Sequence, residues 1–177
     1  NNFSKILGLS SGLLIITYPF MKRITFWPQL FLGFTFNWGV LLGWSVFFES
    51  LTIEIIILYM AGIFWTLGYD TIYALQDRRD DLKIKVKSTA LKFEYDIKNF
   101  LFFCYISTIT LLIGLGFLTS RSLTYFVLLA IAALHLAYQV IIIQKIKSNN
   151  REKIQMVFNS NNSFGILIFL IFFLEIY

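Results

Sequence analysis

The sequence is poor in charge, and it lacks the residues that build disulfide-linked or cysteine-based sites. Only 14% of its 177 residues are charged, while 58% are hydrophobic and 19% are aromatic. Soluble globular domains carry about 25% charged residues, so this composition excludes that class. Cys104 is the one cysteine, which excludes a disulfide framework and a cysteine-based metal site. The first residues have no basic segment followed by a small-residue cleavage site, so we expect no cleavable signal peptide.

The apolar residues fall into long runs separated by short polar stretches, which is typical of transmembrane helices. We predict six spans and treat residues 1–177 as one domain, an all-α polytopic transmembrane helix bundle. The predicted spans are about 6–21, 28–48, 53–76, 99–119, 122–144 and 163–177. Within the second span, Gly33, Gly39 and Gly43 predict close approach of a neighbouring helix.

The cations are distributed unevenly between the two ends of this bundle. When the loops are assigned alternately, every lysine and arginine except Lys5 and Arg121 falls on one side, including Lys145 and Lys147. The positive-inside rule makes that side cytoplasmic, so both chain ends face away from the cytoplasm. The net charge of +5 therefore indicates membrane orientation, and we expect no nucleic-acid partner.

The chemical centre of the sequence lies where the third apolar run becomes acidic. At about 100° per residue, Asp70, Tyr73, Asp77 and Asp81 fall on one narrow stripe of a helix. Asp77 and Asp81 are one turn apart, and two unpaired carboxylates there would repel each other unless a cation lay between them. Mg²⁺ is the expected ion, because it takes oxygen ligands and is commonly shared between carboxylates and phosphates.

Two alternatives stay open at this stage. The stripe could be an acidic helix end that is neutralised by Arg78, Arg79 and Lys83. Tyr18 and Lys22 also share a helix face at i, i+4, and they could clamp a diphosphate or simply anchor the first span at the membrane surface.

Polar residues elsewhere predict packing contacts more than chemistry. Asn37 and His135 lie inside apolar spans, where a hydrogen bond to a neighbouring helix is the usual role. The stretch 145–160 is basic and polar and is predicted to be a loop. The stretch 82–98 alternates charges, and it could cap a cavity or lie on anionic lipid.

Several blocks of this sequence closely resemble the 4-hydroxybenzoate polyprenyltransferases of the UbiA superfamily. The resemblance covers essentially the whole chain, and the long blocks are specific where an isolated pair of spaced aspartates would not be. The blocks are Tyr18-Pro19-Phe20-Met21-Lys22-Arg23-Ile24-Thr25-Phe26-Trp27-Pro28-Gln29, Leu32-Gly33, Trp38-Gly39, Tyr69-Asp70-Thr71-Ile72-Tyr73-Ala74, Asp77-Arg78-Arg79-Asp80-Asp81, Lys83-Ile84-Lys85, Lys87-Ser88-Thr89 and Asn161-Asn162 with Gly165.

The resemblance implies an intramembrane enzyme that uses Mg²⁺ to transfer a polyprenyl group from polyprenyl diphosphate to the ring of 4-hydroxybenzoate, ortho to its hydroxyl, in ubiquinone biosynthesis. It implies a bacterial or mitochondrial inner membrane, with the active site facing the cytoplasm or matrix. Asp77 and Asp81 match the family's second aspartate motif and would hold the metal.

Further site residues follow from position and charge. Tyr18 and Lys22 match the family's YxxxK element, and Asp70 lies on the stripe as a further catalytic candidate. The remaining expected substrate contacts are Arg23, Tyr73, Lys83 and Lys87.

The sequence departs from the family pattern in one respect. The resemblance implies nine spans and a first aspartate-rich motif on an early helix, and this chain starts near the fourth span. We therefore expect a missing N-terminal portion, and we predict that the longer parent is the enzyme and that this segment alone is inactive. The alternatives are a related prenyltransferase with another acceptor, such as haem or a naphthoate, and a small transporter with a cavity lined by Asp70 and His135.

Overall fold

The computed structural model describes residues 1–146 and 150–175, and within them every regular element is a helix. Lys147 and the last two residues of the predicted final span lie outside the described residues. The helices are α1 (Asn2–Ile24), α2 (Pro28–Phe48), α3 (Ile53–Lys83), α4 (Thr89–Lys92), α5 (Ile97–Leu118), α6 (Leu123–Lys145), α7 (Arg151–Asn159) and α8 (Asn161–Leu174).

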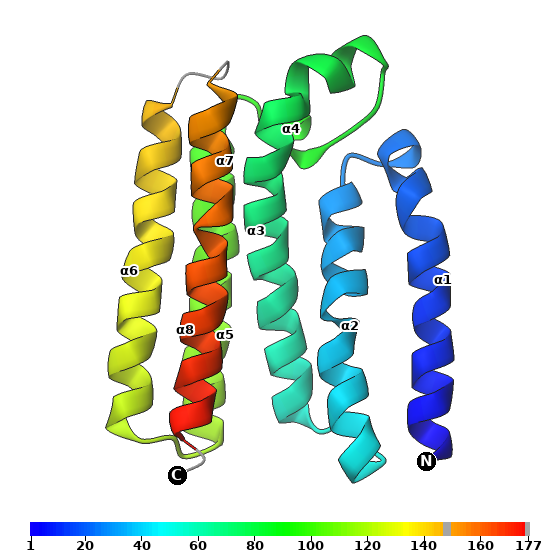
Figure 1. Cartoon of the computed structure of the whole chain (residues 1–177), viewed down its shortest axis with the longest axis vertical. Coiled ribbons are helices and arrows are strands. Elements are labelled where there is room, and N and C mark those ends of the chain that lie inside the picture. The colour runs from blue at the N-terminus through cyan, green and yellow to red at the C-terminus, as the bar shows by residue number, and fades with distance from the viewer. Residues whose placement is uncertain (147–149, 176–177) are drawn as a thin grey trace.

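Six of the helical segments in the described part of the chain are long and apolar enough to cross a membrane. Five are α1, α2, α3, α5 and α6, and the sixth is α7 together with α8. Figure 1 shows these helices side by side, with both chain ends at one end of the bundle and α4 at the other. The prediction of an all-α bundle with six spans is confirmed.

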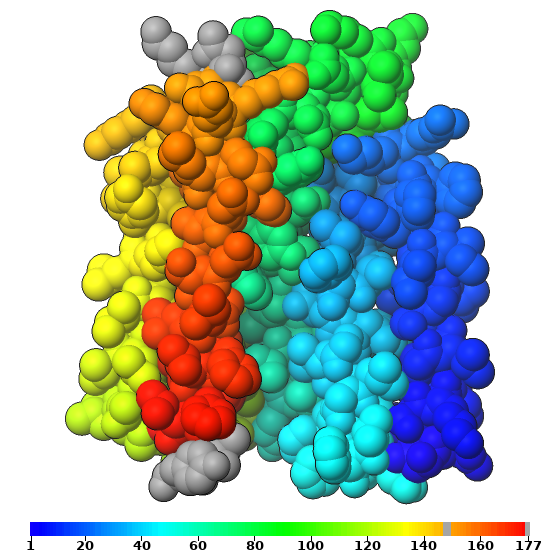
Figure 2. All heavy atoms as spheres, in the orientation of Figure 1, coloured from blue at the N-terminus to red at the C-terminus, as the bar shows by residue number. Residues whose placement is uncertain are grey.

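Helix α3 is the centre of the bundle because it packs against α2 on one side and α5 on the other, and it also contacts α7. Half of its most apolar window is buried, compared with 6% for α1. Helix α1 stands at the edge of the molecule and packs on α2 (Figure 2). Its apolar side chains therefore face outward, as expected for a helix surrounded by lipid.

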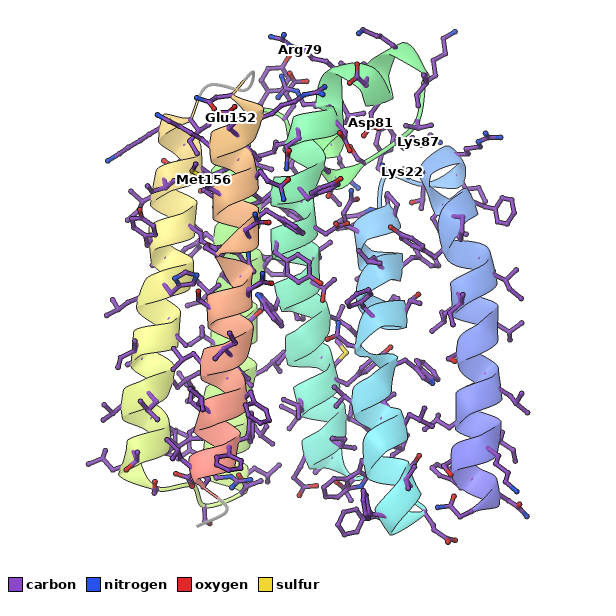
Figure 3. The ribbon with its side chains drawn as sticks, viewed as in Figure 1. Lys22, Arg79, Asp81, Lys87, Glu152 and Met156 are labelled. Carbon is purple, nitrogen blue, oxygen red and sulfur yellow. The ribbon has the colours of Figure 1, made fainter. Side chains whose placement is uncertain are left out.

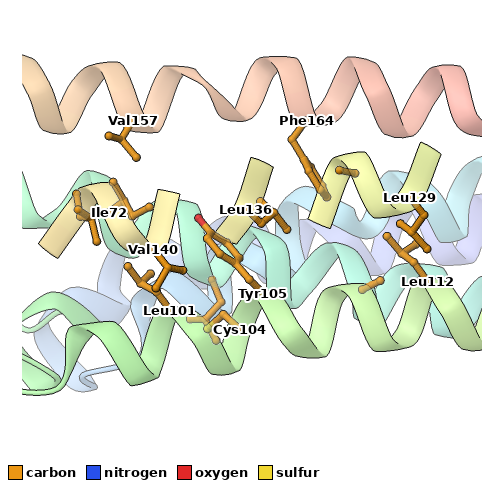
Figure 4. Packing of buried hydrophobic residues seen from close by; sticks show 14 of the residues in the cluster. Ile72, Leu101, Cys104, Tyr105, Leu112, Leu129, Leu136, Val140, Val157 and Phe164 are labelled. Carbon is orange, nitrogen blue, oxygen red and sulfur yellow. The ribbon is translucent and has the colours of Figure 1, made fainter. Parts of the chain in front are cut away.

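Two apolar clusters hold the helices together. The larger joins α3, α5, α6, α7 and α8 through buried side chains such as Ile72, Leu101 and Leu136 (Figure 4). The smaller joins α2 to α3 through Leu41 and Ile63. Because lipid is as apolar as these side chains, the close fit between helices stabilises the bundle more than burial alone.

Close approach occurs at only one of the three glycines predicted to allow it. A Cβ added at Gly33 would lie 3.2 Å from the carbonyl oxygen of Ile63, so α2 and α3 touch there. Gly39 and Gly43 have open space at that position, so the close approach that they permit does not occur there. Glycine in an apolar helix permits a contact, but which face meets a neighbour is decided by packing.

The prediction of a loop over residues 145–160 is wrong for its second half. Residues Arg151–Asn159 form α7, which Asn150 caps by accepting a hydrogen bond from the Lys153 N–H at 3.1 Å. Ile154 and Val157 are buried on one face, while the charged residues point outward. The apolar residues of this stretch recur at helical spacing, so it forms an amphipathic helix. This helix adds to the N-terminal end of the last span, before the continuous apolar run begins.

Candidate functional site

The acidic stripe runs along the part of α3 that leaves the membrane. A helix of 31 residues is about 46 Å long, whereas the hydrocarbon layer is about 30 Å thick. Asp70 and Asp81 are both on α3 but are about 16 Å apart along its axis. The stripe therefore joins the interior of the bundle to its charged end.

At the charged end, α1 and α3 meet through an ion pair. The Lys22 ammonium lies 3.8 Å from Asp81 Oδ1, which is too long for a direct hydrogen bond. The Asp81 side chain is 6% exposed and that of Lys22 is 40% exposed. Figure 3 shows Lys22, Asp81 and Lys87 together where these helix ends approach.

The Oδ2 atom of Asp81 is buried and has no hydrogen-bond partner in the described structure, although Ser88 and Lys22 both interact favourably with the Asp81 carboxylate. Leaving a buried charged oxygen unpaired is costly, because water no longer solvates it. Lys22 is also the cation electrostatically coupled to Asp70, and Asp77 is coupled to both Asp70 and Asp81. Lys22 thus acts on two carboxylates, Asp70 and Asp81, and both also lie within electrostatic range of Asp77, so acidic charge exceeds basic charge along the stripe.

The orphaned oxygen of Asp81 fits a bound cation. Asp77 is half-buried and makes no ion pair or hydrogen bond among the described residues, so its oxygens are also available. Within residues 1–146 and 150–175, no group of three or more His, Cys, Asp and Glu side chains could hold a metal. Asp70 is too far along α3 to complete such a group, so this chain offers Asp77 and Asp81 as a partial ligand set for Mg²⁺.

Tyr18 lies on α1 within electrostatic range of Asp70, so it belongs to the interior part of the stripe. Tyr73 is 40% exposed, and its ring lies 5.0 Å from that of Phe158 on α7. Of the two aromatic candidates, Tyr18 is half-buried near Asp70, and Tyr73 is at the surface beside α7.

The other predicted cations are not beside the carboxylates of the stripe. The Lys83 ammonium bonds to Asp80 at 3.1 Å, and Arg151 bonds to the other oxygen of Asp80 at 2.6 Å, both at the exposed surface. Arg23 is exposed at the end of α1. Arg78 pairs with Glu94 at 2.8 Å. The alternative of an acidic helix end neutralised by nearby cations is therefore correct for Asp80. Asp81 has no ion pair with Lys83 or Arg151.

Lys87 connects the segment after α3 to α1. Its backbone N–H donates to the Lys22 carbonyl at 2.7 Å, and its ammonium donates to the Ile24 carbonyl at 2.9 Å. The N–H of Thr89 donates to the buried side-chain oxygen of Gln29 at 3.0 Å. These bonds hold the turn before α4 against the end of the bundle, where Thr89 and Ala90 are fully buried.

Below the charged end, a cavity of about 860 Å³ opens between α2, α3 and the α7–α8 region. Asp70 is the only carboxylate among its described lining residues. Its wall is rich in aromatic rings, and Asn37 and Asn161 add amide groups. None of the described residues of the segment 84–96 lines it, so that segment covers the bundle end without capping this cavity. The lining residues are Leu32, Phe36, Asn37, Trp65, Thr66, Tyr69, Asp70, Phe158, Asn161, Asn162, Gly165, Ile166 and Phe169.

Hydrogen bonds between helices hold the polar wall of this cavity. Asn37 donates to the Thr66 hydroxyl at 2.8 Å, which confirms its predicted interhelical bond. The Trp65 indole donates to Asn161 Oδ1 at 2.9 Å. His135 on α6 is 3.0 Å from the carbonyl oxygen of Ser160, which confirms the packing role predicted for it.

Sequence reasoning missed the residue at the centre of this polar network. Gln139 is fully buried, accepts a hydrogen bond from the Tyr105 hydroxyl at 2.6 Å and donates to the Ser160 hydroxyl at 2.9 Å. It therefore joins α5 and α6 to the junction of α7 and α8. Its spacing of i, i+4 from His135 inside an apolar run was the available signal.

These features define an integral membrane protein of the helical-bundle class, in which an aromatic cavity lies next to an acidic site at the charged end. The chain belongs to the UbiA prenyltransferase family, whose model matches residues 1–162.

Curated relatives from cattle, a plant and humans share one description. The chain is 45% identical over 171 residues to "4-hydroxybenzoate polyprenyltransferase, mitochondrial" of Bos taurus, covering 96% of this chain and 45% of that protein. It is 45% identical over 170 residues to the protein of that description from Arabidopsis thaliana, covering 96% of this chain and 41% of that one. The human protein of the same description is 42% identical over 171 residues, and the match covers 96% of this chain and 45% of it.

The fold also matches a solved structure, described as giving "structural and mechanistic insights into the biosynthesis of Digeranylgeranylglyceryl phosphate synthase in membranes". The TM-score is 0.73 with 18% identity, and the match covers 99% of this chain and 62% of that one. This likeness shows the helical fold. The chain spans less than half the length of the curated relatives that it matches.

Proposed function

We propose that this chain is the part of a 4-hydroxybenzoate polyprenyltransferase that carries one of its two metal-binding motifs. The reaction would transfer a polyprenyl group from polyprenyl diphosphate to the ring of 4-hydroxybenzoate, a step in ubiquinone biosynthesis. The observation that carries this proposal is the acidic stripe of α3, which joins an aromatic cavity of about 860 Å³ to a buried carboxylate with one oxygen that lacks a hydrogen-bond partner.

At the charged end, Asp77 and Asp81 would hold Mg²⁺, which supplies positive charge to the diphosphate as it leaves. Lys22 lies beside Asp81 and is 40% exposed, so its ammonium can reach phosphate oxygens without leaving this site. The remaining metal ligands would come from other parts of the complete protein, because the described acids form no larger group.

Inside the cavity, the bond between the allylic carbon and the diphosphate oxygen would break, and its electron pair would leave with the diphosphate. The resulting allylic cation would bond to the ring carbon ortho to the hydroxyl, and that carbon would then lose its proton. The aromatic wall can stabilise the cation and exclude water, and Asp70 is placed to accept the proton. Tyr18 and Tyr73 would contact the substrates near Asp70.

Lys83, Lys87 and Arg23 have a weaker basis as diphosphate ligands. The ammonium groups of Lys83 and Lys87 already bond to Asp80 and to the Ile24 carbonyl. We propose that these cations attract the anionic substrate to the charged end through their summed field.

For the membrane setting, we propose that the charged end faces the cytoplasm or the mitochondrial matrix. All described cations except Lys5 and Arg121 belong to that end, as the positive-inside rule requires. The printed names of the curated relatives favour the mitochondrial inner membrane over a bacterial one.

The test is an acceptor panel with the complete protein in lipid vesicles. Prenylated 4-hydroxybenzoate should form with Mg²⁺ and a polyprenyl diphosphate, and chelation of the metal should stop the reaction. A naphthoate and haem serve as competing acceptors. Prenylation of one of these with no product from 4-hydroxybenzoate would contradict the proposed substrate, and substrate flux without any prenylated product would indicate a transporter.

A further inference from the structure

A second cavity lies between α6 and α7 and shares no lining residue with the large cavity. Its volume is about 650 Å³, and its described lining includes Tyr138, Ile142 and Met156. Tyr138 and Met156 are 57% and 69% exposed, so this cavity opens at the surface of the bundle. Met156 is labelled beside α6 and α7 in Figure 3.

The mouth of the cavity is positively charged. Lys145 ends α6 and Lys153 lies in the first turn of α7, and both line the cavity. Neither ammonium makes an ion pair or hydrogen bond to another described residue, so both charges remain available. The N-terminus of α7 adds the positive end of a helix dipole at Asn150. Glu152 opposes this charge, but it is exposed and does not line the cavity.

Polarity changes along the cavity in the way that it changes across a lipid monolayer. Seven residues separate Tyr138 from Lys145 on α6, which is about 10 Å of helix. Met156 lies about 5 Å below Lys153 on α7. The two ammonium groups therefore lie nearer the charged end, and the wall below them carries the apolar side chains of Ile142, Met156 and Val157, together with the hydroxyl groups of Tyr138 and Ser160. This order of charge and then apolar surface matches a lipid headgroup followed by its acyl chains.

We propose that this cavity binds one anionic phospholipid, with its phosphate between Lys145 and Lys153 and an acyl chain against Ile142 and Met156. The two charges complement a phosphate, and the depth of the apolar wall requires a hydrocarbon tail attached to it. The lipid would stabilise the junction of α6 and α7 from outside and would not enter the site on α3.

Binding is tested by native mass spectrometry of the complete purified protein with added phosphatidylglycerol, using phosphatidylcholine as the neutral lipid. We expect one phosphatidylglycerol to be retained selectively. The double variant Lys145→Gln/Lys153→Gln should lower the binding constant for phosphatidylglycerol by roughly thirtyfold. The reason is that it removes two basic groups, each with the attraction that a lysine has for an anionic membrane surface. The matched control is Lys85→Gln/Lys98→Gln, which removes two exposed lysines of the same end outside the cavity, and it should keep wild-type binding.

A second variant tests the apolar wall with both lysines in place. Ile142→Trp should fill the cavity and weaken phosphatidylglycerol binding, while the elution profile of the protein stays unchanged. Free glycerol phosphate should not compete, because it has no acyl chain. Equal loss in both lysine pairs, retention of lipid by Ile142→Trp or effective competition by glycerol phosphate would each overturn the proposal.

Discussion

Asp81 stands out among the acidic residues of α3 because it is buried while its neighbour Asp80 is exposed. Asp80 is neutralised by Lys83 and Arg151, whereas Asp81 has one lysine at 3.8 Å, a favourable interaction with Ser88 and one oxygen without a hydrogen-bond partner. Adjacent residues of the same type thus have different environments, since a helix turns by about 100° per residue.

This contrast gives a matched pair of variants in the complete protein. Asp81→Asn should lower kcat by roughly 100-fold or more, because it removes a charge that would hold the metal. Asp77→Asn should act in the same direction. Asp80→Asn should retain activity within about twofold, because an exposed ion pair contributes little. Turnover measured at saturating Mg²⁺ checks this, and similar activity in all three variants would remove the metal assignment.

Lys22 is the cation that the fold brings to the stripe. Lys22→Ala should raise KM for the polyprenyl diphosphate by roughly tenfold, because one charge-assisted contact to phosphate is lost. KM for 4-hydroxybenzoate should change little, and Lys22→Arg should restore much of the affinity. Steady-state kinetics with each substrate varied in turn separates the two effects. An equal rise in both constants would show that Lys22 holds the fold.

At the scale of elements, the junction of α7 and α8 is held by side chains from two other helices, α6 and α3. Gln139 and His135 on α6 contact Ser160, while Trp65 on α3 donates to Asn161. The charged first half of this last span is thereby fixed against the bundle, and Asn161 is held at the wall of the large cavity.

Gln139→Leu should lower the melting temperature in detergent, because it leaves the buried Tyr105 hydroxyl and the partly buried Ser160 hydroxyl without this partner. The expected loss of stability is about 1–3 kcal/mol, since interhelical hydrogen bonds in membranes contribute about 0.6 to 2 kcal/mol each. Gln144→Leu is the control, because Gln144 bonds only to a carbonyl of its own helix. A melting temperature that falls equally in both variants would contradict the bridging role.

At the scale of the whole molecule, the described acids form no group of three or more that could hold a metal by itself. The chain also covers 41 to 45% of the length of its relatives in cattle, Arabidopsis and humans. We therefore expect the 177-residue chain alone to insert into vesicles but to form no prenylated product. The measurement is product formation from 4-hydroxybenzoate and a polyprenyl diphosphate with Mg²⁺, with the complete protein as positive control. Turnover by the short chain would show that its own residues suffice.

Local pattern was enough to predict the spans, the end of the bundle that carries the cations and the shared face of Asp70, Asp77 and Asp81. These features depend on hydrophobic run length and helical period, and both can be determined from residues that are close in the sequence. The roles assigned to those aspartates, and to Tyr18 and Lys22, stay predictions.

Only the tertiary structure decided which groups meet across helices. It brought Lys22 to Asp81 and left Lys83 with Asp80, although the charge of the two lysines is the same and does not distinguish them. It also made α7 a helix, placed Gln139 at the centre of a polar network and opened the cavity next to Asp70. The physical reason is that these contacts depend on how helices distant in sequence pack, and no local period contains that information.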